Sequence, residues 1–299
     1  MIKKLQNYWN KPNHAAYIFL LPSILVLFSF VIIPLIGTFI ISLLDMNIFL
    51  TNIKFVGLDN FRKFFQDARA INAMKNTLYF TLLETPTQVI FGLIMAVLLS
   101  KTTRFNKFSR SIFFIPVVCS MTSIGIIFSM LLDPNIGAIP YFFNQMGMAT
   151  PQFFRDPDMA MPTVAIMTVW KNFGVTMTIL LTGIHGISES LYEAASIDGA
   201  TEIQKFFKIT IPQLAPSIGF CLLTNLIGSL QVFDQVYVTT NGGPQFRTET
   251  AVQYIYSRGF SAPYELGYAS AISFILFIII SVLAVAINIY NNKQEAKMR

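Results

Sequence analysis

The sequence predicts an all-α integral membrane protein with six transmembrane helices and a helical cytoplasmic loop. Of its 299 residues, 54% are hydrophobic and only 12% are charged, whereas soluble globular domains average about 45–50% apolar and about 25% charged residues. The apolar residues also occur in long runs, and a helix needs about 20 of them to cross a bilayer. Composition and patterning together therefore argue against a soluble enzyme.

Six apolar runs are long enough to be transmembrane helices, and each ends at charged or turn-forming residues. They lie at 15–44, 77–100, 111–132, 162–184, 215–238 and 266–290. The first run is too long for the core of a signal peptide and lacks a small-residue cleavage pattern, so we expect it to be retained. The expected organisation is a cytoplasmic segment 1–14, a membrane domain 15–290 and a cytoplasmic tail 291–299.

The basic residues predict the orientation of these spans. If the N-terminus is inside, twelve Lys and Arg residues lie in cytoplasmic segments and eight lie outside. This bias predicts that both termini are cytoplasmic. The net charge of +6 comes from short clusters between apolar runs, which are typical of orientation signals and disfavour nucleic-acid binding. Aromatic residues near helical spacing in the first outer loop, Phe55–Asp67, predict a short surface helix.

The loop at about 185–215 is patterned as two short helices. Ser190 and Glu193 have the spacing of a capping box, in which a hydroxyl and a carboxylate satisfy free donors at a helix start. Gly199 can adopt the positive φ of a turn without penalty. Thr201 and Gln204 repeat the capping pattern. We therefore expect one helix on each side of Gly199.

The second of these helices is predicted to be amphipathic. Ile203, Phe206 and Phe207 are spaced to share one face, and Pro212 is expected to end the segment. Such a helix can lie on the inner leaflet of the membrane, or it can enter the groove of a soluble partner. The pattern by itself favours neither alternative.

Specific residues of this loop favour the partner. Glu193-Ala194-Ala195, three residues, Gly199, nine residues and Ile209-Thr-Ile-Pro212 resemble the loop signature of permease subunits of bacterial ATP-driven (ABC) importers. Ile211 stands where leucine is usual, which is a mild departure.

Further segments resemble the carbohydrate branch of that family, which includes the maltose, multiple-sugar and raffinose permeases. They are Phe19-Leu-Leu-Pro-Ser23, Phe55-Val-Gly-Leu-Asp-Asn60, Phe113-Phe-Ile-Pro116, Pro134-Asn-Ile-Gly137, and Phe233-Asp-Gln-Val-Tyr237 leading to Gly242-Gly-Pro244. The last segment is especially similar to the first permease type of such systems. The resemblance extends over almost the whole chain.

The resemblance implies a type I ABC importer permease fold in a bacterial cell membrane. It also implies a second permease as heterodimer partner, two ATPase subunits docked on the cytoplasmic loops, and an external sugar-binding protein. The residues expected to couple the chain to the ATPase are Glu193, Ala194, Ala195, Asp198, Gly199, Ile203, Phe206, Ile209 and Pro212. The sequence contains no phosphate-binding loop of the G-x-x-x-x-G-K-[ST] type, so ATP and Mg are expected on the partner ATPase. We expect no cofactor on this chain.

Polar residues inside the spans are candidates for a sugar path. Their burial in lipid costs free energy, so each such residue is by default a candidate for a functional role. The candidates are Trp170, Lys171 and Thr178 in the fourth span and Asn225, Gln231 and Asp234 in the fifth. Polar side chains also bond helix to helix in ordinary bundles, and Lys171 and Asp234 could pair with each other. For Glu84 we expect a structural or interfacial role, and for His185 an orienting hydrogen bond.

Two other classes of function are weighed against this interpretation. A membrane enzyme would need clustered His, Cys or carboxylate side chains, but the two His and two Cys residues are scattered and have no metal-ligand spacing. An ion-coupled secondary transporter could titrate Lys171, Glu84 and Asp234, yet it would not explain the 193–212 loop. Within the importers, a glycerol phosphate or a polyol is an alternative solute to a sugar.

Overall fold

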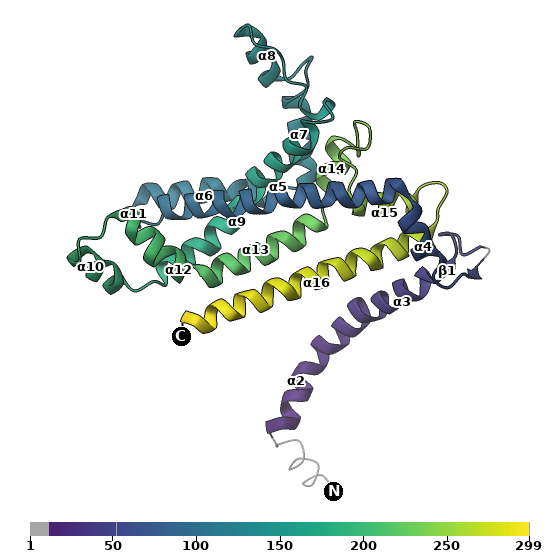
Figure 1. The fold of residues 1–299 in the computed structure, drawn as a ribbon, viewed down its shortest axis with the longest axis horizontal. Coiled ribbons are helices and arrows are strands. Elements are labelled where there is room, and N and C mark those ends of the chain that lie inside the picture. Colours follow the sequence, from purple (N-terminus) through teal and green to yellow (C-terminus); the bar gives the residue numbers. More distant parts are fainter. Residues whose placement is uncertain (1–11, 52, 299) are drawn as a thin grey trace. The chain divides into compact units, whose positions relative to one another are not determined.

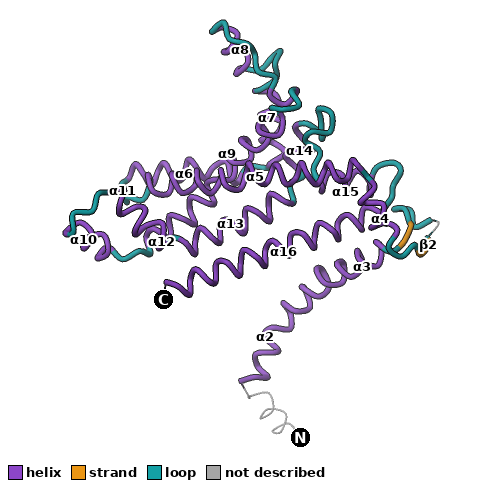
Figure 2. The backbone as a smooth tube through the Cα atoms, viewed as in Figure 1, coloured by secondary structure: helices purple, strands orange, loops and turns teal. Residues whose placement is uncertain are grey.

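The chain divides into two compact units, which are described separately. The computed structural model describes residues 12–51 and 53–298. The first unit runs to Gln66 and includes Ile255–Ile275, and the second comprises Asp67–Tyr254 and the chain from Leu276. Figure 2 shows helix over most of the described chain, with one small pair of strands.

The first unit begins with one long helix built from α2 (Pro12–Leu27), a π-helical turn η1 (Phe28–Ile32) and α3 (Ile33–Ser42). The strands β1 (Leu44–Asp45) and β2 (Lys54–Phe55) then pair in antiparallel fashion, with Leu44 opposite Phe55. The short helix α4 (Asp59–Gln66) follows, which confirms the helix predicted in the first outer loop.

Polar contacts hold α4 in place within this unit. The Asn60 side chain donates 2.9 Å hydrogen bonds to the carbonyl oxygens of Ser42 and Leu44. Lys63 and Arg258 both pair with Glu265, at 2.5 Å and 3.4 Å. Glu265 directly precedes α16 (Leu266–Met298), and Arg258 lies on α15 (Ala251–Phe260). The end of the first long helix, α4 and the start of α16 are therefore tied together.

The second unit is a bundle built on α5 (Ala68–Leu98), α6 (Arg104–Val118), α9 (Ala160–His185) and α13 (Ala215–Leu230). Helix α5 packs along α9, and both contact α13, as Figure 1 shows. Asp67 caps α5 by accepting hydrogen bonds from the backbone N–H groups of Arg69 and Ala70. Between α7 (Met121–Leu131) and α9 lie the short helices α8 (Ala138–Gln145) and η2 (Phe153–Arg155).

Four of the six predicted spans are single helices. The described residues contain four helices long and apolar enough to cross a membrane, namely Phe19–Ser42, Ala68–Leu98, Ala160–His185 and Leu266–Lys293, and six spans result if each of two bent helix pairs counts as one. The six-span prediction is therefore met only when α6 with α7, and Glu202–Gln213 with Ala215–Leu230, are each taken as one broken span, and Glu202–Gln213 belongs to the loop that was predicted to be cytoplasmic.

The prediction of the third span as one helix over 111–132 is wrong. The span consists of α6 and α7, which meet at an angle of 96°. Cys119 and Ser120 both have extended backbones, so the helical hydrogen-bond ladder stops after Val118. The break lies within a run that is apolar enough on average to be one span, although Ser120, Thr122 and Ser123 lie at it.

The fifth span, predicted over 215–238, is also interrupted. Helix α13 ends at Leu230, and α14 (Asp234–Thr239) begins only after a non-helical turn. Val232 in that turn and Val236 in α14 are buried. At its other end α13 is bent by 65° from the preceding helical segment. The turn thus places the side chains of Val232 and Val236 in the core. A straight helix over 215–238 would direct these side chains elsewhere.

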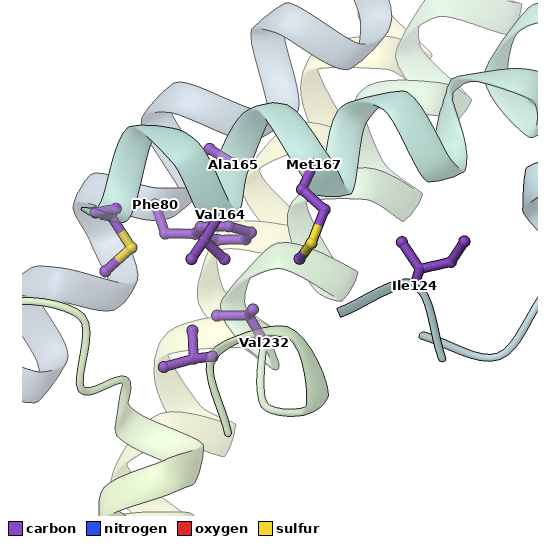
Figure 3. Close-up of a cluster of buried hydrophobic side chains, with 8 residues drawn as sticks. Phe80, Ile124, Val164, Ala165, Met167 and Val232 are labelled. Atoms are coloured by element: carbon purple, nitrogen blue, oxygen red, sulfur yellow. The ribbon is translucent and has the colours of Figure 1, made fainter. Parts of the chain in front are cut away.

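These side chains complete a hydrophobic core in the second unit. Phe80 of α5, Ile124 of α7 and Val164 and Met167 of α9 pack with Val232, as Figure 3 shows. All five are less than a tenth exposed. Helix α7 of the third span and the turn after α13 are therefore both packed against the unbroken helices α5 and α9.

Candidate functional site

The loop after α9 folds into two helical segments joined at Gly199. Helix α10 (Glu189–Ile197) is followed by Gly199 with φ +76°, and a Cβ built there would meet no other atom within 4 Å. The second segment comprises α11 (Glu202–Lys205), the π-helical turn η3 (Phe206–Thr210) and α12 (Ile211–Gln213). The predicted helix pair and its glycine turn are confirmed.

The second segment starts with the predicted capping box. Gln204 Oε1 accepts from the Thr201 N–H at 2.8 Å, and Thr201 Oγ1 accepts from the Gln204 N–H at 3.3 Å. The first predicted box is wrong, because α10 already begins at Glu189 and Ser190 lies inside it. The hydroxyl of Ser190 instead bonds that of Ser188, at 2.7 Å.

Pro212 does not end the segment as predicted. It lies in α12, directly after η3, and the chain leaves the helix only at Leu214. Proline has no N–H to donate within an α-helix, and Pro212 follows the π-helical turn η3, in which each hydrogen bond spans one residue more than in an α-helix. The chain leaves the helix two residues after Pro212.

Apolar side chains of this helix pair are exposed. Ile197, Ile203 and Phe207 are 88%, 72% and 64% exposed. Glu193 and Ala194 are exposed on α10, and Ala195 and Ile209 are half-buried. So large an apolar surface on a short polar loop is typical of a contact site for another molecule.

Beside this surface lies a hollow of about 770 Å³. Ile203, Phe206 and Phe207 line it together with Tyr192 and His185. The Tyr192 hydroxyl is 2.9 Å from the Thr210 hydroxyl, which ties the two helical segments together. His185 Nε2 lies 2.9 Å from the Ser100 carbonyl oxygen, which is the orienting hydrogen bond expected for this residue.

A second candidate site is a polar cavity of about 220 Å³ inside the bundle. Its polar lining comprises Glu84 and Gln88 of α5, Thr168 and Asn172 of α9, Thr224, Asn225 and Ser229 of α13, and Gln235 of α14 (Asp234–Thr239). The Gln88 Nε2 donates to Asn225 Oδ1 at 3.0 Å, and Asn225 Nδ2 donates to Thr176 Oγ1 at 3.2 Å. Three helices thus meet through one hydrogen-bond network.

Of the residues predicted to line a sugar path, the structure places Asn225 on this cavity. Gln231 and Asp234 are exposed at the break between α13 and α14. Thr178 donates to the Gly174 carbonyl of its own helix at 2.8 Å. Trp170 is 43% exposed and its ring centroid lies 5.4 Å from that of Phe128. The predicted residues are therefore not gathered at one place.

Lys171 is engaged at the broken third span. Its Nζ donates to the Val117 carbonyl oxygen and to Asn172 Oδ1, both at 3.2 Å. The last carbonyls of a helix lack intrahelical partners, so this amine caps the end of α6. Among the described residues no ion pair joins Lys171 to Asp234.

Sequence reasoning missed Gln88 as a member of the cavity wall and assigned Glu84 no partner. Thr85 donates to Glu84 Oε2 at 3.0 Å and lies 3.0 Å from the Ser229 hydroxyl. Glu84 and Gln88 are four residues apart in one apolar run, which places them on the same helical face. This four-residue spacing is the feature of the sequence that could have identified Gln88 as a neighbour of Glu84.

Polar contacts also fix the chain outside the bundle core. Arg69 holds the buried carboxylate of Glu249 with two 2.8 Å hydrogen bonds, and Asn76 donates to the carbonyls of Phe246 and Glu249. Elsewhere Arg155 pairs with Asp133 at 2.6 Å. The pKa of Asp133 lies below its usual range, chiefly because the carboxylate accepts a hydrogen bond from the backbone N–H of Asn135, and the positive charge of Arg155 lowers this pKa further.

The class of protein follows from these features together with the family comparison. Residues 88–299 match the family described as the binding-protein-dependent transport system inner membrane component, and the chain belongs to this family of ABC transporter permeases. It is therefore a multi-pass inner-membrane transport protein. This membership favours the importer interpretation over an ion-coupled carrier.

Individual relatives cover most of the chain. It is 32% identical to the probable ABC transporter permease protein YurN of Bacillus subtilis over 90% of this chain and 93% of that protein. It is also 32% identical to the sulfoquinovosyl glycerol transport system permease protein SmoG of Agrobacterium fabrum, over 80% and 78% of the two chains.

A solved structure shows the same fold. It is a bacterial alginate ABC transporter in complex with an alginate pentasaccharide-bound periplasmic protein, with a TM-score of 0.81 and 24% identity over 99% of this chain and 97% of that one. The predicted type I importer permease fold is thereby confirmed.

Proposed function

We propose that this chain is the transmembrane subunit of an ATP-driven sugar importer. With a second permease it forms the path for a sugar or oligosaccharide delivered by an external binding protein. Support for the solute class comes from the relatives, one named for sulfoquinovosyl glycerol transport and one solved with an alginate pentasaccharide on its periplasmic protein. The family description itself refers to dependence on a binding protein.

The observation that carries the proposal is the exposed helix pair around Gly199. Two helical segments held at a positive-φ turn form a rigid element that can enter the groove of an ATPase subunit. Its exposed apolar residues Ile203 and Phe207 supply the contact. Movement of the ATPase subunits is then passed to α9 and α13, which flank the pair in the chain.

The remaining coupling residues have supporting roles in this proposal. Glu193, Ala194 and Ala195 lie in α10, and Asp198 and Gly199 form the turn. Ile209 and Pro212 lie where the second segment approaches α13. ATP and Mg bind to the two ATPase subunits rather than to this chain, so this subunit contributes no hydrolytic residue.

Solute contacts are assigned to α9 and α13 with the turn after α13. Asn225 lies on the polar cavity, and Gln231 and Asp234 at the helix break offer exposed polar groups. Trp170 presents an aromatic face that can cover the apolar face of a sugar ring. Lys171 and Thr178 act through structure, because their polar atoms are held by backbone carbonyls.

The orientation of the chain in the membrane follows from the proposed contact between the helix pair and the ATPase subunits. The helix pair must face the cytoplasm to meet the ATPase subunits, and an even number of spans then places both termini on that side. The excess of basic residues in the segments assigned inside supports this arrangement.

Co-purification tests the proposal. The tagged chain, extracted from its native membrane in mild detergent, should carry ATP-hydrolysing activity with it. Ile203→Asp should remove that activity from the purified material, because a carboxylate would be buried in the contact. Ile136→Asp is the matched control, since Ile136 is similarly exposed (78%, against 72% for Ile203) and lies in a loop assigned to the outer side. Equal retention of the ATPase by both variants would refute the docking surface.

A further inference from the structure

The turn between α5 and α6 carries positive charge that the chain does not balance. The sequence contains no aspartate or glutamate between Glu84 and Asp133. Arg104 and Lys107 are exposed at the start of α6, and neither forms an ion pair within the part of the chain that the structure describes. Two exposed cations without a carboxylate favour an anionic partner from outside the chain.

The other two basic residues of this stretch have partners inside the protein. Lys101 interacts electrostatically with Glu202 of α11. Arg110 donates hydrogen bonds to the carbonyl oxygens of Leu99, Ser100 and Lys101, at 3.0, 3.1 and 3.2 Å. Free carbonyls at the end of a helix carry partial negative charge. Arg110 therefore offsets the partial charge at the end of α5 that would repel an anion bound beside the turn.

Hydrogen bonds hold the backbone of this turn in one conformation. The Asn106 side chain donates to the Lys101 carbonyl oxygen at 3.0 Å, and the Asn106 N–H donates to the Thr103 hydroxyl at 3.2 Å. The two unpaired cations of α6 therefore project from a fixed backbone. Binding to a pre-organised site loses less conformational entropy than binding to a mobile loop.

An exposed apolar face of α6 begins beside these cations. It comprises Phe105, Phe108, Ile112 and Ile115, which are 45% to 74% exposed. Their spacing of three and four residues places them on one face of the helix. Helix α6 thus presents positive charge at its first turn and apolar surface along the turns that follow. Headgroup and acyl chain follow each other in the same order in a phospholipid.

The turn lies at the end of the bundle that is assigned to the cytoplasm. His185, where the chain leaves α9 for the helix pair around Gly199, has its Nε2 2.9 Å from the carbonyl oxygen of Ser100. The α5–α6 turn and the helix pair are therefore at the same end of the second unit. Anionic lipids give the cytoplasmic leaflet a negative surface potential, which attracts basic segments next to a span.

We propose that the α5–α6 turn is a binding site for an anionic phospholipid, with Arg104 and Lys107 against the headgroup and Phe105 and Phe108 against the acyl chains. A second permease could also cover this face, but it would have to place carboxylates directly beside apolar side chains. A phospholipid carries both groups in one molecule, so charge complementarity favours the lipid. The proposal does not depend on the proposed function, from which only the choice of leaflet follows.

Quenching of tryptophan fluorescence by brominated lipids measures contact at this turn. Phe108→Trp places a reporter at the proposed acyl-chain contact, and its signal is the difference from the complex that keeps Phe108. The assembled complex is reconstituted in vesicles of phosphatidylcholine and phosphatidylglycerol, with bromine on the acyl chains of one lipid at a time. Leu82→Trp on α5 is the control reporter, because Leu82 is similarly exposed (64%, against 65% for Phe108) and residues 76–100 contain no Lys or Arg.

We expect Phe108→Trp to report a preference for phosphatidylglycerol of about five- to twenty-five-fold, since each cation near an anionic surface contributes about fivefold. Arg104→Gln and Lys107→Gln should each lower this preference about fivefold, whereas Arg104→Lys should keep most of it. Lys75→Gln removes an exposed cation near the start of α5 and should leave the preference unchanged. Leu82→Trp should be quenched nearly equally by the two lipids.

Equal quenching of Phe108→Trp by the two lipids would overturn the proposal, and so would a preference that survives when Arg104 and Lys107 are both replaced by glutamine. Absence of quenching by either lipid would show that protein covers this face in the assembled complex, which also overturns it. An equal preference at Leu82→Trp would indicate general enrichment of anionic lipid instead of a site. Co-purifying ATP hydrolysis reports separately on the proposed importer function.

Discussion

Replacing Gly199 with valine tests the coupling loop at the residue that sets its geometry. Gly199 has φ +76°, and a Cβ there meets no atom within 4 Å. The cost of the substitution therefore arises from the backbone and not from a clash. A left-handed conformation costs a residue with a side chain about 1–2 kcal/mol, and a β-branched side chain is among the least tolerant.

This strain should be relieved by a change in the angle between α10 and the second helical segment. If the ATPase binds only the native turn, a penalty of about 1–2 kcal/mol reduces its affinity about five- to thirty-fold. Sugar uptake should fall with it, while membrane insertion stays normal because no span is altered. The assay is titration of the purified ATPase subunit onto the permease complex, together with uptake by whole cells.

Gly199→Asn is the matched control, because asparagine adopts the left-handed region more readily than other residues with a side chain. It should retain most of the affinity that valine loses. Normal ATPase binding and uptake in Gly199→Val would refute the coupling role of this turn. If asparagine were as damaging as valine, the cause would be a contact with the side chain rather than the φ angle.

Three further predictions concern orientation and stability. Single cysteines at the exposed positions Gln152 and Gln204, in a cysteine-free background, should react oppositely with an impermeant thiol reagent on intact cells, with only Gln152 labelled. The effects of Lys171→Ala and Asp234→Ala on complex stability should add within about 0.5 kcal/mol, because Lys171 is held by a backbone carbonyl. Arg69→Leu should lower stability by about 1–3 kcal/mol, measured by thermal unfolding, because it leaves a buried carboxylate without its cation.

Each of these three predictions has an outcome that would contradict it. Labelling of Gln204 but not Gln152 would reverse the orientation. A double Lys171/Asp234 variant more stable than either single variant would reveal an ion pair. For Arg69, the control is Arg62→Leu, since Arg62 forms an exposed pair with Asp59 and such pairs contribute about 0–1 kcal/mol. Equal losses for Arg62 and Arg69 would show that burial of the carboxylate is unimportant.

Local chemistry made much of the coupling loop predictable. The capping box of Thr201 and Gln204 involves atoms three residues apart, and the turn at Gly199 depends on that residue's own backbone freedom. The box assigned to Ser190 and Glu193 was wrong because the chain offered two serines, Ser188 and Ser190, and the helix began after the first. A choice between adjacent start sites depends on small free-energy differences that a motif does not contain.

The sequence by itself determined the membrane class, the four unbroken spans and the helix pair around Gly199. These features depend on hydrophobicity over about 20 residues or on contacts between near neighbours in the chain. The family resemblance carried by Glu193 to Pro212 was equally local, since its residues occupy one loop.

Only the tertiary structure decided where two of the spans break and which polar residues meet. The break at Cys119 and Ser120 lies inside a run that is apolar enough on average to be one span, and mean hydropathy does not distinguish a straight helix from a bent one. Lys171 finds its partner at Val117, and Gln88 finds Asn225, across distances of 54 and 137 residues. Such pairs form because packing of α5, α6, α9 and α13 brings their helical faces together, and a single chain's periodicity does not specify which faces meet.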